Sequence, residues 1–154
     1  MKRILVVIAL VCVIFASKSD ALELANRIGD WKLVSEVVTP LIPDANSEDL
    51  GRMIYRKYSR RKPVGNLTVI LTEGVGFGDL RVPREIPQDN SNTLMKSQTG
   101  YEILRVRNCD AIFEKHEILP DTLAISLGKN RTLTLESYSL NRSELVKIAR
   151  EILK

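Results

Sequence analysis

The chain has 154 residues, of which 44% are apolar and 27% charged, with a formal net charge of +4. This length suits one domain with a core of its own. Removal of residues 1–21 takes away Lys2, Arg3, Lys18 and Asp20, so that 20 basic residues remain against 18 acidic ones. Dedicated nucleic-acid binders carry a larger basic excess, and we therefore expect no nucleic acid among the partners.

The N-terminus has the pattern of a secretory signal peptide. Lys2 and Arg3 precede the apolar run Ile4–Ala16, and small and polar residues follow as far as Ala21. This order predicts export, with a signal peptide at 1–21 and a single domain at 22–154. The apolar run is shorter than the roughly 17–25 residues of a membrane-spanning helix, so a retained anchor is the weaker alternative. We expect a secreted or periplasmic protein without a permanent membrane span after cleavage.

The first part of the predicted domain contains a strand and a hairpin. Leu22–Ile28 is predicted as a short helical lead-in that ends at a Gly-Asp pair. Trp31–Val38 is rich in β-branched residues and predicts a strand. Arg52–Arg60 and Asn66–Glu73 alternate in the manner of strands, and the turn residues 61–65 between them predict a β-hairpin.

A long segment of low periodicity follows the hairpin. Residues 74–92 contain three glycines and two prolines, which is unusual for a structureless connection inside a compact domain. The segment is therefore predicted to be either a functional flap, which can gate a ligand, or partly ordered. The flap residues proposed from the sequence are Gly74, Gly76, Phe77 and Gly78. The glycines lack the spacing and the Lys-Ser/Thr pair of a phosphate-binding loop.

The remaining strands show clean alternation. Tyr101–Asn108, Ala111–Ile118, Thr122–Leu127 and Thr132–Ser137 each place apolar residues on one face, and a turn is predicted at 108–110. A period of two with one apolar face predicts an antiparallel meander that is half exposed to solvent.

The chain ends in a predicted amphipathic helix. Asn141 and Glu144 have the spacing of a capping box. The apolar stripe of the helix, which contains Leu145, Ala149 and Ile152, requires cover. The predicted fold class is therefore α+β, with an antiparallel β-meander sheet packed against the C-terminal amphipathic helix.

The basic cluster Arg56–Lys62, with which Tyr55 and Tyr58 are interleaved, is the first candidate site. Where basic and aromatic residues are interleaved, the basic side chains can neutralise an anionic polymer and the aromatic side chains can stack on it. The ligand-binding residues proposed from this pattern are Tyr55, Arg56, Tyr58, Arg60 and Arg61. The alternative is a solvated hairpin tip that protects a sheet edge from aggregation.

Catalytic and metal-binding patterns are not found in the sequence. His116 is the only histidine, and with Glu114 it supplies two side chains on one strand face, fewer than a zinc site uses. We therefore predict no catalytic residues, no metal and no cofactor. Cys109, in a predicted turn, is the only cysteine after residue 21. An exposed thiol there suggests a homodimer linked through Cys109, and burial of the thiol beneath the turn is the alternative.

The last third of the chain carries a resemblance. The segments Tyr101–Ile103, Asn108–Ala111, Thr132–Ser137 and Glu144–Ala149 together look similar to the end of Mog1/PsbP-like domains and of the extracytoplasmic domains associated with bacterial anti-sigma factors. This resemblance implies a protein that binds or scaffolds other molecules and has no shared catalytic residues. The expected function is that of a non-enzymatic accessory or binding protein of the cell envelope. Its partner would be an envelope protein or an anionic ligand.

Overall fold

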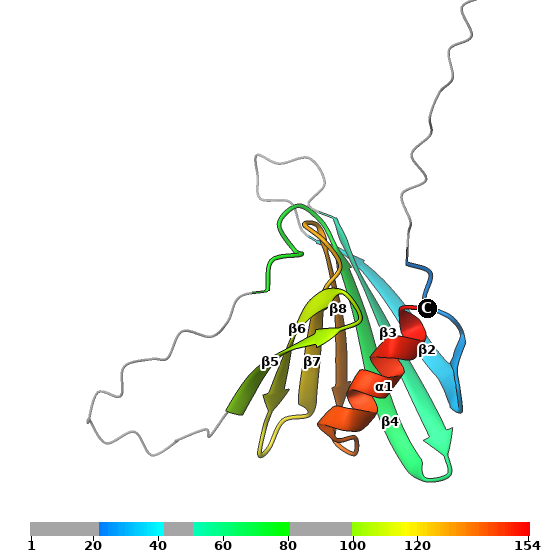
Figure 1. The fold of residues 1–154 in the computed structure, drawn as a ribbon. Coiled ribbons are helices and arrows are strands. Elements are labelled where there is room, and N and C mark those ends of the chain that lie inside the picture. The colour runs from blue at the N-terminus through cyan, green and yellow to red at the C-terminus, as the bar shows by residue number, and fades with distance from the viewer. Residues whose placement is uncertain (1–21, 42–50, 81–99) are drawn as a thin grey trace, which may run out of the picture.

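The computed structural model describes residues 22–41, 51–80 and 100–154. In these ranges eight strands form one antiparallel sheet, and a single helix follows them (Figure 1). The elements are β1 (Arg27–Ile28), β2 (Trp31–Pro40), β3 (Arg52–Arg61), β4 (Val64–Glu73), β5 (Gly100–Val106), β6 (Cys109–Lys115), β7 (Asp121–Ser126), β8 (Arg131–Ser137) and α1 (Arg142–Ile152). The expected signal peptide, and the flap from residue 81 to 92, lie outside the described ranges. No helix within these ranges is long and apolar enough to cross a membrane.

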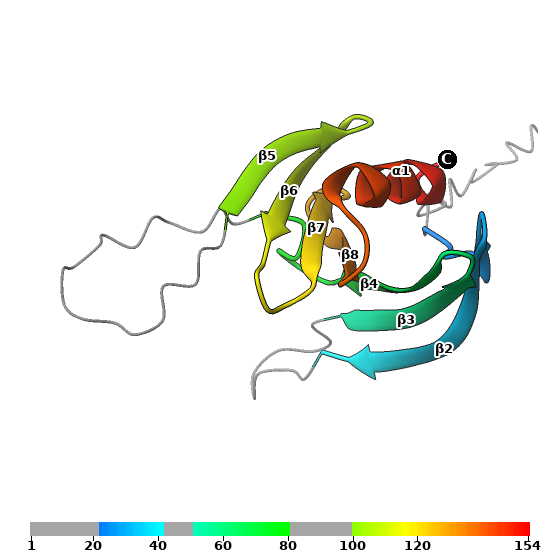
Figure 2. The same ribbon diagram turned by 90° about the horizontal axis from the view of Figure 1, so that it is seen from below.

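The sheet has the strand order β1-β2-β3-β4-β8-β7-β6-β5. Strands that follow one another in sequence are therefore neighbours within each half, and the antiparallel pair of β4 and β8 joins the halves. The prediction of an antiparallel sheet with a C-terminal helix is confirmed. The predicted four-strand meander is only half of this sheet, because the hairpin of β3 and β4 continues it. Seen along the strands, the sheet is strongly curved and α1 lies on its concave side (Figure 2).

The core fills the space between the concave face and α1. Alternate residues of the central strands are buried there, among them Leu67 and Leu71 of β4 and Leu133 of β8. On the helix, Leu145 and Ala149 have no exposed surface. The predicted capping box is confirmed, because the backbone N–H of Glu144 donates to the Asn141 side chain and the Glu144 carboxylate accepts from the Asn141 N–H. Local capping and tertiary burial thus fix the same helix start.

The predicted helical lead-in at Leu22–Ile28 is wrong. Residues 22–26 have no regular structure, and Arg27–Ile28 form β1, which pairs with the start of β2. Gly29 adopts a φ of 54° in the tight turn between these strands, a conformation that glycine reaches without steric cost. Leu24 and Ile28 are both buried in the core. Their spacing resembles one helical turn, but their burial is achieved by an extended segment.

The turn after β5 falls earlier than predicted. Arg107 and Asn108 form it, and Arg107 has a φ of 55°. The Arg107 guanidinium donates to the backbone oxygen of Arg150 at 3.0 Å, which fixes this turn to the end of α1. Cys109 consequently belongs to β6 and is half-buried against the core instead of lying in a turn.

Candidate functional site

The predicted basic cluster lies on β3, where strand alternation divides its side chains between the two faces of the sheet. Arg56 pairs with Val69 and Tyr58 with Leu67, and both partners are buried on the concave face. Directly opposed residues of an antiparallel pair share a face, so Arg56 and Tyr58 also lie there. Tyr55 lies on the convex face because successive side chains alternate. The proposed residues therefore do not form one surface.

Arg56 and Tyr58 hold the segment that precedes β1. The Arg56 guanidinium forms an ion pair with Glu36 and donates to the backbone oxygen of Leu24. The Tyr58 hydroxyl donates to the backbone oxygen of Ala25 at 2.8 Å. Burial of Tyr58 raises the pKa of its hydroxyl, and Arg56 offsets part of that rise. Both side chains are thus engaged in structural contacts within the chain.

A Tyr58→Phe variant tests this structural role. Loss of the hydrogen bond to Ala25 should lower the free energy of unfolding by about 0.5–1.5 kcal/mol at neutral pH. Because the folded state has the higher pKa, the contribution of the neutral hydroxyl is complete below the unfolded pKa and disappears as the pH rises through the folded pKa. The difference in free energy of unfolding between the unmodified protein and Tyr58→Phe, measured in urea, should therefore become smaller above about pH 10.

The exposed Tyr138 provides the control for this variant. Its side chain is 79% exposed, so Tyr138→Phe should leave the free energy of unfolding unchanged. The proposed titration would be contradicted if the difference in free energy of unfolding between Tyr58→Phe and the unmodified protein stayed constant across the alkaline range.

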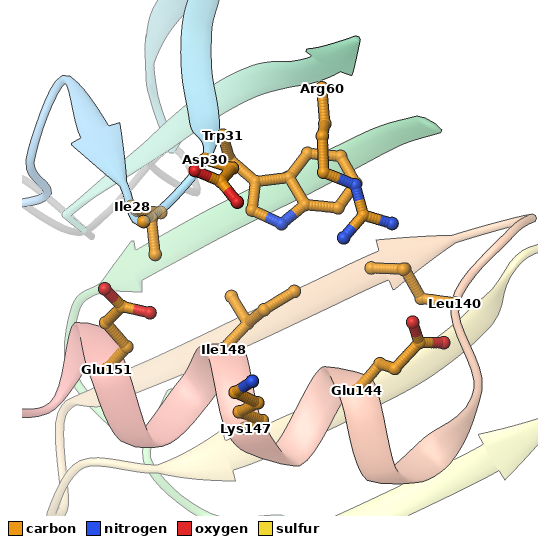
Figure 3. A pocket seen from close by; sticks show the side chains of 10 residues that line it. Ile28, Asp30, Trp31, Arg60, Leu140, Glu144, Lys147, Ile148 and Glu151 are labelled. Atoms are coloured by element: carbon orange, nitrogen blue, oxygen red, sulfur yellow. The ribbon is translucent and has the colours of Figure 1, made fainter. Parts of the chain in front are cut away.

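Arg60, a further member of the cluster, lies at a pocket between the β1–β2 turn, the end of β3 and α1 (Figure 3). Its guanidinium is 4.6 Å from the centre of the Trp31 ring, and its Nε donates to the backbone oxygen of Pro63 at 3.0 Å. We call this cavity of about 240 Å³ the Trp31 pocket. Its apolar floor consists of Ile28, Trp31, Leu140 and Ile148. Arg61, the last residue of β3, is exposed outside it.

Trp31 is the central residue of this pocket. Its side chain is only 3% exposed, and it packs against Gly65, where a Cβ would lie 3.1 Å from the ring. The ring edge that carries the indole nitrogen faces α1 across the cavity (Figure 3). Among the described residues no side chain or backbone group accepts a hydrogen bond from this N–H. Among the described residues, the fully buried side-chain polar atom that lacks a hydrogen-bond partner is Arg142 Nε, so the Trp31 nitrogen keeps contact with the cavity. Its N–H is therefore available to a bound group that accepts a hydrogen bond.

Five charged side chains surround the apolar floor. They are Asp30, Arg60, Glu144, Lys147 and Glu151. Three carboxylates and two bases make the rim nearly balanced in charge. Such a rim is suited to a polar ligand whose own charges are distributed, and it is less suited to a polyanion.

A second hollow, the outer groove, lies on the convex face and has a volume of about 430 Å³. It contains the remaining aromatic member of the cluster, Tyr55, with Lys57 5.7 Å from the centre of its ring. Thr68, Glu136 and Tyr138 also line it. The structure therefore places Tyr55 and Arg60 at two separate hollows on opposite faces of the sheet.

The described part of the predicted flap is attached to the turn between β7 and β8. The N–H of Gly74 donates to the Asn130 oxygen at 2.8 Å, and the N–H of Gly78 donates to the Lys129 oxygen at 3.0 Å. Phe77, 38% exposed, lies between these two anchor points. A gating role for Gly74, Gly76, Phe77 and Gly78 remains a prediction.

The two other reactive side chains lie away from both hollows. His116 Nε2 is 3.4 Å from a Glu114 oxygen, so these two residues do share a face as predicted. Within the described ranges no three histidine, cysteine or acidic side chains gather closely enough to hold a metal ion. Cys109 is half-buried next to the core, and the proposed homodimer remains a prediction.

The sequence predicted Arg60 as a site residue but did not predict its neighbours in the Trp31 pocket. One signal was present, since Trp31 is the only tryptophan and lies next to a Gly-Asp turn. Its pairing with α1 required the fold. A scan against protein-family models found no match, and comparisons with the curated proteins and with the solved structures found no significant match either.

Proposed function

We propose that this chain is an exported, non-enzymatic binding protein of the cell envelope that takes a small polar ligand into the Trp31 pocket. The observation that carries the proposal is the indole N–H of Trp31, which faces the cavity and has no acceptor among the described residues. Ligand sites are typically apolar cavities with a few convergent polar groups. The Trp31 pocket has this composition.

Binding, rather than catalysis, is favoured by the lining of the pocket. None of the described lining residues is a serine, cysteine or histidine, the side chains that most often act as nucleophile or general base. The pattern of residues 1–21 supports export to the envelope. The sequence resemblance to envelope domains that bind or scaffold supports the same function.

The outer groove supports a second candidate, binding of an anionic ligand or envelope polymer. Lys57 and Tyr55 together present a cation and an aromatic face on the rigid strand β3. An anionic polymer could bind the first group and stack on the second. Arg56, which the sequence assigned to this function, is instead engaged with Glu36 and Leu24.

Tryptophan fluorescence separates the two candidates because Trp31 is the only tryptophan. The chain from residue 22 onward would be titrated with acetate, ethylammonium, diglycine and dextran sulfate, and heat of binding would be measured in parallel. We expect at least one small ligand to change Trp31 emission with saturation. Dextran sulfate that binds with unchanged emission, and less well to Lys57→Gln, would indicate the outer groove. If none of the small ligands alters the emission or releases heat, the proposed function is wrong.

A further inference from the structure

We propose that the Trp31 pocket selects a zwitterion, such as an amino acid or short peptide, with its ammonium group at Asp30 and Glu151 and its carboxylate at Trp31 Nε1 and Arg60. This inference rests on the proposed function and adds the chemical class of the ligand. The pocket gathers opposite charges around one N–H donor that faces the cavity.

The charged side chains of the pocket do not form ion pairs with one another. Among the described residues, none of Asp30, Arg60, Glu144, Lys147 and Glu151 forms an ion pair within 4.0 Å. Asp30 and Lys147 are exposed, and Arg60, Glu144 and Glu151 are half-buried. Groups of both signs that remain separate can each receive the opposite charge of a ligand.

The two ends of the pocket differ in charge. Glu151 lies at one end beyond Ile28, Asp30 lies between Ile28 and Trp31, and Arg60 lies at the other end (Figure 3). Glu151 reaches this position over Gly29, where an added Cβ would lie 3.3 Å from its carboxylate. The acidic end therefore attracts an ammonium group.

The opposite end offers donors for a carboxylate. Within the described ranges, Arg60 donates a hydrogen bond only through its Nε, to Pro63, so its two terminal nitrogens can bind a ligand. Glu144 stands near this end, but one of its oxygens already accepts the Asn141 N–H at 3.1 Å in the capping box. The Arg60 guanidinium and the indole N–H of Trp31 together can hold a carboxylate by hydrogen bonds, of which those from arginine are charge-assisted.

The middle of the pocket suits the uncharged part of such a ligand. Ile28 and Ile148 form apolar floor between the two ends. Lys147 stands on the open side of the cavity, where α1 faces solvent. A ligand with separated charges and a short neutral linker would thus meet complementary groups along its whole length.

The experiment compares triglycine with its two blocked forms, with Trp31 emission as the readout. Triglycine has both charges, N-acetyl-triglycine lacks the ammonium and triglycine amide lacks the carboxylate. We expect triglycine to bind at least ten times more tightly than either blocked form, with affinity falling as salt is added. Glycine and diglycine, titrated in the same way, determine the preferred length.

Two variants assign the ends of the ligand. Arg60→Gln should abolish the preference for triglycine over its amide, and Glu151→Gln should abolish the preference over the N-acetyl form. The matched controls are Arg61→Gln and Glu117→Gln, which change the same charges at exposed positions outside the pocket. Both controls should retain the full preference.

The possible results separate selectivity for a zwitterion from ligand binding in the Trp31 pocket as such. A blocked form, acetate or ethylammonium that binds as tightly as the zwitterions would overturn the inference and leave the proposed function standing. If none of these probes changes Trp31 emission or gives heat of binding, both fail. Equal loss of preference in Arg61→Gln and Arg60→Gln would also overturn the assignment of the carboxylate end.

Discussion

Replacement of Leu145 by alanine should lower the free energy of unfolding by about 2–5 kcal/mol. The side chain has no exposed surface and lies in the core that α1 shares with the concave face of the sheet. The helix packs against β1, β5, β7 and β8, so the cavity left by the deletion is bounded by several rigid elements. Equilibrium unfolding in urea measures the loss, with far-UV circular dichroism as the probe.

Ser143→Ala is the matched control, because Ser143 belongs to the same helix and is exposed. It should change the free energy of unfolding by less than about 0.5 kcal/mol. If Leu145→Ala does not fold, Leu145→Met replaces it, with an expected loss below about 1.5 kcal/mol. Equal stability of Leu145→Ala and Ser143→Ala would mean that the apolar stripe is not covered by the sheet.

The elements of the fold were predictable where their signals are local. The alternation of apolar and polar residues in β7 and β8 can be seen within each strand, and the Asn141–Glu144 capping box spans only four consecutive residues. The pair of β4 and β8 joins Thr68 to Glu136, which are far apart in sequence. No local pattern contains that information, so the sequence predicted a hairpin and a meander without predicting that they form one sheet.

The residues that form the candidate site were not predicted correctly, for a different reason. Arg56 and Tyr58 are close in sequence to Tyr55, and proximity suggested a single binding surface. Alternation along β3 already implied that neighbours face opposite sides, so this part of the error could have been avoided. The Trp31 pocket could not have been predicted in this way, because Asp30, Arg60 and Glu144 meet only after the sheet curves around α1.

The second large effect is expected at Gly78. This residue is buried, and a Cβ added to it would lie 1.5 Å from the backbone oxygen of Gly128. The clash is with backbone in the β7–β8 turn, so it cannot be relieved by rotation of a side chain. Gly78→Ala should therefore separate the two turns, break the hydrogen bond to Lys129 and lower the free energy of unfolding by about 1–3 kcal/mol.

Gly100→Ala is the control, because a Cβ there meets nothing within 4 Å and its φ is not positive. It should leave the stability unchanged or raise it by up to about 1 kcal/mol.

Amide hydrogen exchange at Gly74 and Gly78 locates the effect, since both N–H groups donate to the β7–β8 turn. In Gly78→Ala these amides should exchange faster than in Gly100→Ala. If instead both variants have the stability of the unmodified protein and Gly78 exchanges rapidly in all three, this part of the segment is open in solution. That result would favour the gating flap that the glycine-rich sequence predicts over a docked turn.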